Sequence, residues 1–328
     1  MDLKRSTEKA GGSGGGGAAS AAASAAASSA SSAAAASKRP DPPPRPAPLD
    51  LELELSKIVG LDSVKAALRN FKHEIELDKR RRELGFGIDQ ARAEHMCFMG
   101  NPGTGKTTIA RLVARILADV GIVENYTFVE VQRSDLVEGY IGQTAKKTRA
   151  VIESARGGCL FVDEAYRLVP SGGSGGGSKD FGAEAINELM SAMQEGGDAP
   201  VMMFAGYTDD MKRFFQANEG LTRRIPRQWE FEDMSVPQLV ELTRIIVKHS
   251  PFSIADAVTD ADLMSILEQH TTAKQRSKLN GGLCSLLLRL AKEHLDRRLT
   301  LGTASADNIM TYIRKDLVNA AKRLPMPP

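Results

Sequence analysis

Residues 100–107 read Gly-Asn-Pro-Gly-Thr-Gly-Lys-Thr, and this Gly-x-x-x-x-Gly-Lys-Thr stretch decides the fold. A short apolar run, His95–Met99, precedes it, and a helical pattern from about Lys106 to Ala118 follows it. Glycines let successive backbone N–H groups turn toward a phosphate, at a helix N-terminus whose dipole favours anions. The strand–loop–helix unit therefore predicts a site for the phosphates of a nucleotide.

ATP and Mg²⁺ are the cofactors that this loop predicts. We expect Lys106 to pair with the β- and γ-phosphates, and Thr107 to offer its hydroxyl oxygen to Mg²⁺. The expected nucleotide-binding residues are Gly100, Asn101, Pro102, Gly103, Thr104, Gly105, Lys106, Thr107 and Thr108.

Two acids follow a second apolar run, since residues 159–164 read CLFVDE. A continuous apolar run is typical of a strand buried on both faces, and ligands of parallel sheets bind at the carboxyl ends of the strands. We expect Asp163 to help hold Mg²⁺ and Glu164 to act as general base for the attacking water. The alternative is an acidic strand end that is simply solvated.

The rest of the folded part alternates strands with helices. Apolar runs predict strands at 127–132, 201–207 and 229–231, and helical periodicity appears at 143–155 and 180–194. A helix capped by Asp62 is expected to bury Val64, Leu68, Phe71 and Ile75. After Ser235 the expected helices are 236–248, 260–270, 281–298 and 305–322. The predicted fold class is α/β, a parallel sheet with helices on both faces, followed by a small all-helical lobe.

Composition separates a tail from this folded part. Residues 11–17 read GGSGGGG, residues 18–37 are all Ala or Ser, and residues 38–48 read KRPDPPPRPAP. We predict three regions, a disordered tail at 1–56, an α/β domain at 57–233 and a helical domain at 234–328. The tail suits a linker or an organelle transit peptide, and Asp2 and Glu8 favour the linker. The expected location is intracellular, with the cytoplasm favoured and a plastid as the alternative.

Net charge, cysteine spacing and hydropathy argue against several classes of protein. The net charge of the 328 residues is only +2, so nucleic acid is not an expected partner. Cys97, Cys159 and Cys284 are far apart and lack metal-ligand spacing, which argues against a disulfide scaffold or zinc site. No run of about 18 apolar residues occurs, so no membrane association is expected.

Six segments, in this order, resemble the AAA+ ATPases and within them the CbbX (CfxQ, red-type Rubisco activase) family. The resemblance runs from about Leu55 to Phe231, and it implies a ring-forming, usually hexameric remodeller that pulls protein segments through a central pore. The small helical lobe then corresponds to the family's lid domain. The segments are GNPGTGKTTIARLVARIL, LVEGYIGQTAKKT, GGCLFVDEAYRL, DFGAEAINELM, FAGYTDDMKRFFQANEGL and RRI.

The resemblance also implies roles that the residues alone do not. It places Ile58, Val59 and Gly60 at the adenine pocket, and Tyr207 or Thr208 at the nucleotide-sensing position. Arg224, with Arg223 beside it, matches the arginine finger that reaches a neighbouring subunit's phosphate. The matching pore loop is Tyr140, Ile141 and Gly142. Without the resemblance, a half-buried turn aromatic and two surface arginines would be expected instead.

The chain departs from the family pattern at two places. Relatives carry a phosphate-sensing arginine on the lid, whereas the segment NGGLCSLLL (280–288) puts Ser285 there. Arg289, one helical turn further on, is a candidate replacement. The second departure is the glycine-serine insert at 171–178.

The predicted function is Mg²⁺-dependent ATP hydrolysis coupled to the remodelling of a protein client by a homo-hexameric ring. Rubisco is a possible client through the resemblance, and nothing in the chain specifies one. Two alternatives stay open. One is a nucleotide-switched scaffold with little hydrolysis, suggested by the missing lid arginine. The other is a DNA-acting motor, for which Lys146, Lys147 and Arg149 are the local support.

Overall fold

The computed structural model describes residues 48–86, 94–140, 142–169, 181–300 and 302–326. The chain divides into two units, Met1–Asp41 and Pro42–Pro328, and the described residues all belong to the second. Residues 1–47 of the predicted tail, Ile141 and the insert at 171–178 lie outside the described residues.

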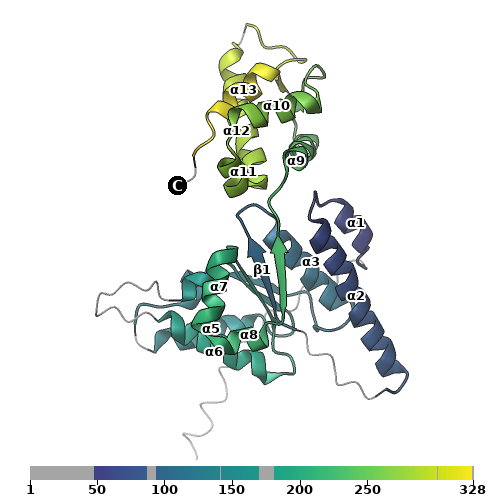
Figure 1. Cartoon of the computed structure of the whole chain (residues 1–328), viewed down its shortest axis with the longest axis vertical. Coiled ribbons are helices and arrows are strands. Elements are labelled where there is room, and N and C mark those ends of the chain that lie inside the picture. Colours follow the sequence, from purple (N-terminus) through teal and green to yellow (C-terminus); the bar gives the residue numbers. More distant parts are fainter. Residues whose placement is uncertain (1–47, 87–93, 141, 170–180, 301, 327–328) are drawn as a thin grey trace, which may run out of the picture. The chain divides into compact units, whose positions relative to one another are not determined.

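Five parallel strands form the central sheet in the order β2-β3-β4-β1-β5 (Figure 1). β1, β3 and β4 are buried along their whole length, as expected for apolar strands covered on both faces. This order places the carboxyl ends of β3, β4 and β1 side by side. The strands are β1 (Met96–Gly100), β2 (Phe128–Val131), β3 (Cys159–Val162), β4 (Val201–Gly206) and β5 (Arg227–Phe231).

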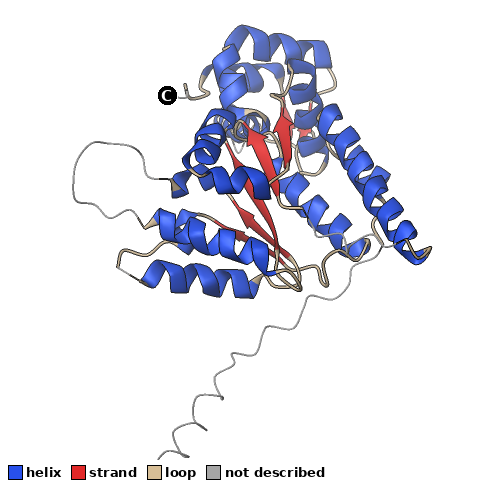
Figure 2. Cartoon of the chain, turned by 60° about the horizontal axis from the view of Figure 1, so that its bottom comes forward, coloured by secondary structure: helices blue, strands red, loops and turns tan. Residues whose placement is uncertain are grey.

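Helices cover both faces of the sheet (Figure 2). Successive side chains of a strand point to opposite faces, so Met96 and Phe98 of β1 pack with α1–α3, whereas Cys97 and Met99 pack with α5–α8. The first group is α1 (Leu51–Ser56), α2 (Asp62–Glu83) and α3 (Lys106–Asp119). The second face carries α4 (Arg133–Leu136), α5 (Gln143–Ser154), η1 (Ala165–Leu168), α6 (Gly182–Glu195), α7 (Thr208–Ala217) and α8 (Glu219–Arg224). The predicted α/β architecture is confirmed.

The helical part of the molecule includes residues that the sequence places in the predicted tail. Residues 51–56 form α1, where the Asp50 carboxylate caps the helix by accepting a hydrogen bond from Leu53 N. Leu51 and Leu55 are buried in the core beside α2 and α3. In α2 the four expected core residues are buried, although the N-cap is Leu61 and Asp62 lies in the first turn.

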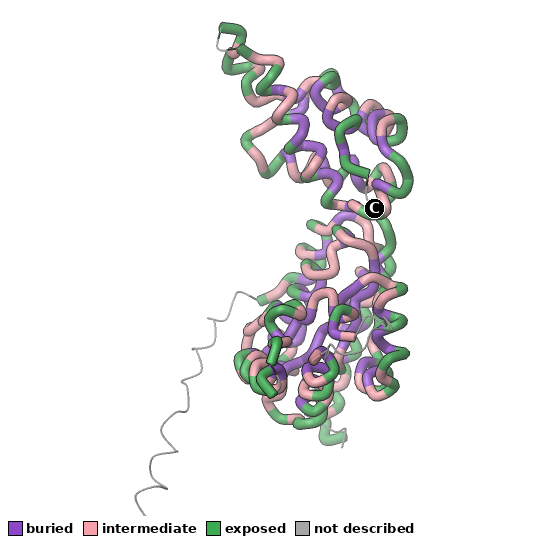
Figure 3. The backbone as a smooth tube through the Cα atoms, turned by 90° about the vertical axis from the view of Figure 1, so that its left-hand side faces the viewer, coloured by how far each residue is buried: buried purple, intermediate pink, exposed green. Residues whose placement is uncertain are grey.

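Five helices build the C-terminal lobe around its own core, seen as the buried interior of that lobe in Figure 3. A short parallel ladder, β6 (Ser253–Ile254) with β7 (Thr311–Tyr312), joins them. The helix expected at 305–322 begins only at Arg314, because Ser305 and Asn308 form a side-chain-capped turn and Tyr312 stacks on Phe252. The helices are α9 (Val236–Lys248), α10 (Asp260–His270), α11 (Ala273–Leu279), α12 (Gly281–Arg298) and α13 (Arg314–Lys322).

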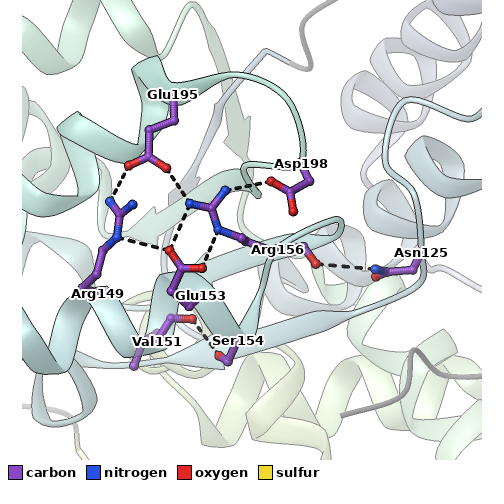
Figure 4. A network of polar contacts seen from close by, with 8 residues as sticks. All are labelled: Asn125, Arg149, Val151, Glu153, Ser154, Arg156, Glu195 and Asp198. Carbon is purple, nitrogen blue, oxygen red and sulfur yellow. Dashed lines mark hydrogen bonds and ion pairs between the residues drawn. The ribbon is translucent and has the colours of Figure 1, made fainter. Parts of the chain in front are cut away.

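An ion-pair network ties α5 to α6 near the amino ends of β3 and β4 (Figure 4). The Arg156 guanidinium contacts Asp198 at 2.8 Å and Glu195 at 2.7 Å, and it also pairs with Glu153. Arg149 of α5 joins the same network through Glu195 and Glu153. We call these five residues the α5–α6 brace. It lies at the sheet edge opposite to the carboxyl ends of the strands.

Candidate active site

The predicted phosphate loop connects the carboxyl end of β1 to the first residue of α3. Gly103 shows why glycine is needed, because its φ is +71° and a Cβ atom there would lie 2.5 Å from the carbonyl oxygen of Leu279. Thr104 is buried, and its hydroxyl donates to Asn101 O at 2.8 Å. The loop is therefore held by its own backbone on one side and by the C-terminal lobe on the other.

The Lys106 ammonium folds back over this loop. It donates hydrogen bonds of 2.8 Å to the carbonyl oxygens of Gly100 and Asn101. Burial lowers the pKa of Lys106, and the nearby carboxylates of Asp163 and Glu164 oppose that shift. The lysine is thus a cation placed at the inner end of the site, close to two acids.

A cavity of about 430 Å³ opens over the loop, a volume in the usual range for ligand sites. It brings together many of the predicted residues with the start of α12. Lining residues are Pro102, Gly103, Gly105, Lys106, Thr107, Thr108, Asp163, Glu164, Gly206, Tyr207, Gly281, Gly282 and Ser285. Thr107 and Asp163, the residues predicted to hold Mg²⁺, face the same cavity.

The two acids after β3 have different surroundings. Asp163 Oδ1 accepts a hydrogen bond of 2.9 Å from the backbone N–H of Glu164. Glu164 takes a left-handed backbone conformation with φ of +50°, and its carboxylate pairs with Arg167 at 3.0 Å. The Tyr166 hydroxyl lies 3.4 Å from the other Glu164 oxygen. Glu164 is therefore oriented by neighbours on the following turn while it still lines the cavity.

Tyr207, at the end of β4, forms one wall of the cavity. Its ring packs against Tyr166, with centroids 5.5 Å apart, and the Lys106 ammonium is 6.0 Å from its centroid. The Lys278 ammonium of α11 lies 5.9 Å from the same centroid. Sequence reasoning did not single out Lys278, because only the folded chain brings α11 to the end of β4. Thr208, the alternative sensing residue, begins α7 and is not among the lining residues.

The first turn of α12 supplies the C-terminal lobe's share of the cavity. Gly281 N donates to Gly103 O at 3.0 Å, and Ser285 lines the cavity one turn later. Arg289 is exposed and is not among the lining residues. The structure therefore places a serine, and not the candidate replacement arginine, beside the phosphate loop.

The segment predicted for the adenine pocket lies near the loop without lining the cavity. Val59 is buried, Ile58 packs on the core, and a Cβ atom on Gly60 would overlap the Gln238 side chain of α9. The neighbouring Leu61 comes within 3.7 Å of the position a Cβ atom would take on Gly105. This segment thus connects the phosphate loop to α9.

The predicted arginine finger lies at the end of α8, away from the lining of the cavity. Arg224 Nη1 donates to Gly220 O at 2.8 Å, and its buried Nε has no hydrogen-bond partner among the described residues. Arg223 is exposed. Neither arginine lines this chain's own cavity.

Tyr140, in the predicted pore loop between α4 and α5, is the most exposed large hydrophobic side chain of the described residues at 78%. Buried Thr144 fixes the base of the loop by accepting from Glu138 N, and Lys147 pairs with Glu138 at 2.7 Å. Gly142 ends the loop with φ of +75°. The tyrosine is thus presented to solvent by an anchored loop.

Cys97, Cys159 and Cys284 are buried free thiols, and burial raises the pKa of each. No helix in the described ranges combines the length and apolar character that crossing a membrane requires.

Comparisons with known proteins give the family. The model of the ATPase family associated with various cellular activities (AAA) matches residues 96–233, and a domain of unknown function (DUF8495) matches residues 248–325. Protein CbxX of Cupriavidus necator is 37% identical over 261 residues, which cover 78% of this chain and 79% of that protein.

Two further relatives carry other names. Stage V sporulation protein K of Bacillus subtilis is 38% identical over 62% of this chain and 61% of its own length. The ESX-1 secretion system protein EccA1 of Mycolicibacterium smegmatis is 38% identical over 70% of this chain, which spans only 38% of that relative. Together with the CbxX match and the phosphate-loop site, these findings show that the chain belongs to the AAA family of ATP hydrolases, in its CbbX/CbxX-type group.

Proposed function

We propose that this chain binds ATP with Mg²⁺, hydrolyses it, and uses the energy to remodel a protein client as part of a ring of identical copies. One observation carries the proposal: the phosphate loop, the acid pair after β3 and the start of α12 line one cavity of about 430 Å³. AAA relatives named for secretion, sporulation and CbxX support ATP-driven work on proteins in general.

The residues fit the nucleotide and its metal. Gly103, Gly105 and Lys106 line the cavity from the phosphate loop. Thr107 with Asp163 is the oxygen donor set that Mg²⁺ prefers. Bound Mg²⁺ supplies charge neutralisation at the β- and γ-phosphates. Lys106 adds a positive charge at the same phosphates after leaving the loop carbonyls that it contacts here.

Glu164 is the residue that takes the proton. Its carboxylate faces the cavity while Arg167 and Tyr166 orient it. A carboxylate held in this way can accept a proton from a water that attacks the terminal phosphate. Tyr207, at the end of β4, closes the wall beside the site of transfer and is the proposed sensing residue.

Two proposed roles require a neighbouring copy or a client. Arg224 does not line its own cavity, so we assign it to the cavity of the next subunit, where its charge would stabilise the transferring phosphate. The exposed Tyr140 is the proposed grip on a threaded peptide. Rubisco is the client that the CbbX resemblance suggests. The chain would then lie in the compartment that holds its client, which is the cytoplasm or, as the alternative, a plastid.

Three variants in one ATPase and nucleotide-binding assay test the proposal. Lys106→Ala should abolish ATP binding, because it removes the cation from the phosphate site. Glu164→Gln and Arg224→Ala should still bind ATP while hydrolysis falls by roughly 10²–10⁵-fold, because both groups act on the transferring phosphate. Normal hydrolysis by all three would refute the site. Glu164→Gln held in ATP should also retain its client for identification in a pull-down.

A nucleotide-switched scaffold is the second candidate, because Ser285 lines the cavity at the place where the family resemblance implies an arginine. Turnover well below once per minute in assembled wild-type protein would favour the scaffold over the motor.

The DNA-acting alternative is weaker, because Lys147 and Arg149 form ion pairs with Glu138 and Glu195. Salt-sensitive binding to duplex DNA would revive it.

A further inference from the structure

Asp233 lies in the short segment between β5 and α9, and two amide side chains donate hydrogen bonds to its carboxylate. Asn101 Nδ2 of the phosphate loop lies 2.9 and 3.1 Å from its two oxygens, and Asn280 Nδ2 lies 2.9 Å from Oδ1. The same Asn101 amide lies 3.0 Å from the Ser277 hydroxyl oxygen. We call Asn101, Asp233, Ser277 and Asn280 the Asp233 cluster.

The cluster stabilises a charged carboxylate. Burial raises the pKa of Asp233, but hydrogen bonds with Ser277, Asn101 and Asn280 outweigh burial and leave the pKa below its usual value. A carboxylate that accepts several hydrogen bonds is held strongly, and without it the Asn101 and Asn280 amides would each lose one acceptor.

Asn280 is the residue where three segments meet. It is fully buried and has φ of +43°, a conformation that asparagine tolerates better than most residues. Its Oδ1 accepts from Met234 N at 2.8 Å, and its Nδ2 lies 3.2 Å from Pro102 O. The next residue, Gly281, donates from its backbone N–H to Gly103 O at 3.0 Å. The Asn280 side chain thus joins three parts of the chain, which are the segment between β5 and α9, the phosphate loop and the start of α12.

We propose that Asp233 and Asn280 are positioning residues for the nucleotide, which hold the phosphate loop against the first turn of α12 so that both walls of the cavity are formed before ATP binds. The phosphate loop and the start of α12 are two of the segments that line the cavity, and the cluster supplies side-chain contacts between them. Pre-formed walls reduce the ordering that binding would otherwise require. This proposal rests on the cavity being the nucleotide site.

The test is ATP affinity in the full chain, measured with a fluorescent ATP analogue at a temperature where every variant is folded. Asp233→Ala should weaken binding about tenfold, because the Asn101 and Asn280 amides each lose one acceptor and the loop loses one of its ties to α12. The control is Asp316→Ala, which removes a buried carboxylate that pairs with Arg298 at 3.1 Å inside the C-terminal lobe. That control should lower the unfolding temperature and leave ATP affinity within about twofold of wild type.

A conservative substitution separates positioning from stability. Asp233→Asn keeps a side-chain oxygen that can accept from the Asn101 and Asn280 amides, so its ATP affinity should stay closer to wild type than that of Asp233→Ala. An Asp233→Ala protein with wild-type affinity, or an Asp233→Asn protein that binds no better than Asp233→Ala, overturns the proposal. If Lys106→Ala also binds the analogue normally, the cavity is not the nucleotide site, and both proposals fall for that separate reason.

Discussion

Charged side chains at the two ends of the parallel strands have different partners. We call these two sides of the sheet the amino edge, where the strands begin, and the carboxyl edge, where they end. At the amino edge, the Arg156 guanidinium of the α5–α6 brace contacts three carboxylates. At the carboxyl edge, the Lys106 ammonium contacts backbone carbonyl oxygens, and Asp163 accepts from a backbone N–H while both side chains face a cavity. The charge of Arg156 is matched by opposite charges, whereas those of Lys106 and Asp163 remain available to a ligand.

Asparagine substitutions at one aspartate from each edge give the largest expected contrast. Asp163→Asn should reduce ATP hydrolysis by more than about 10²-fold, because it removes a carboxylate at the proposed metal site. Asp198→Asn should leave hydrolysis near wild type and lower the free energy of unfolding by roughly 1 kcal/mol, because its partner Arg156 keeps two other carboxylates. Steady-state ATPase rates and urea unfolding measure the two effects.

The reverse outcome would break the comparison. If Asp198→Asn lost hydrolysis as completely as Asp163→Asn, the brace would be part of the catalytic machinery and not a support for α5 and α6.

A smaller effect is expected from a substitution in the exposed loop that precedes α5. Tyr140→Ala should leave the basal ATPase within about twofold, since Tyr140 does not line the cavity, and should reduce client remodelling by tenfold or more. Tyr140→Phe is the matched control, because it keeps the ring that would contact a peptide. The assay uses the client recovered with Glu164→Gln, and normal remodelling by Tyr140→Ala would dispose of the peptide-grip role.

The smallest effect is expected from a titratable group at the amino edge. His95 is half-buried just before β1, its Nδ1 accepts from Met202 N at 3.0 Å, and burial lowers its pKa to about 4. The unfolded chain, with a pKa near 6.5, then binds the proton more readily. Stability should be full above about pH 7 and should decrease as the pH falls from about 6.5 toward 4.

Urea unfolding at pH 7.5 and pH 5 checks this prediction. His95→Gln should remove about 1–2 kcal/mol of the stability lost between the two pH values. His249→Gln, at an exposed histidine, should leave the loss unchanged. An equal loss in wild type and His95→Gln would show that other groups account for the acid sensitivity.

Much of the α/β fold could be predicted because its signals are local. β1, β3 and β4 are continuous apolar runs, and the phosphate loop is a contiguous motif at a strand–helix junction. By contrast, LELELS looked like part of the tail because acids alternate with its leucines, and the burial of Leu51 and Leu55 depends on α2 and α3. Helical periodicity also missed the turn at Ser305–Asn308, which side-chain hydrogen bonds stabilise.

In the candidate site, too, the sequence predicts the residues of contiguous motifs but not the residues that only the folded chain brings together. The motif residues Lys106, Thr107 and Asp163 were predicted, and the structure gathers them on one cavity. Asp233 and Lys278 carry no sequence signal of their own. Their contacts depend on where residues far apart in the chain, Asn101 and Tyr207, lie after folding.

The α5–α6 brace has a mechanical consequence for the exposed loop. α5 starts just after Tyr140 and ends just before Arg156, and its twelve residues make a rod of about 18 Å. If a peptide pulls on Tyr140, the tension passes down this rod to an anchor shared with α6, directly before β3. β3 ends at Asp163 and Glu164, so the load path runs from the client to the proposed catalytic acids through one helix and one strand.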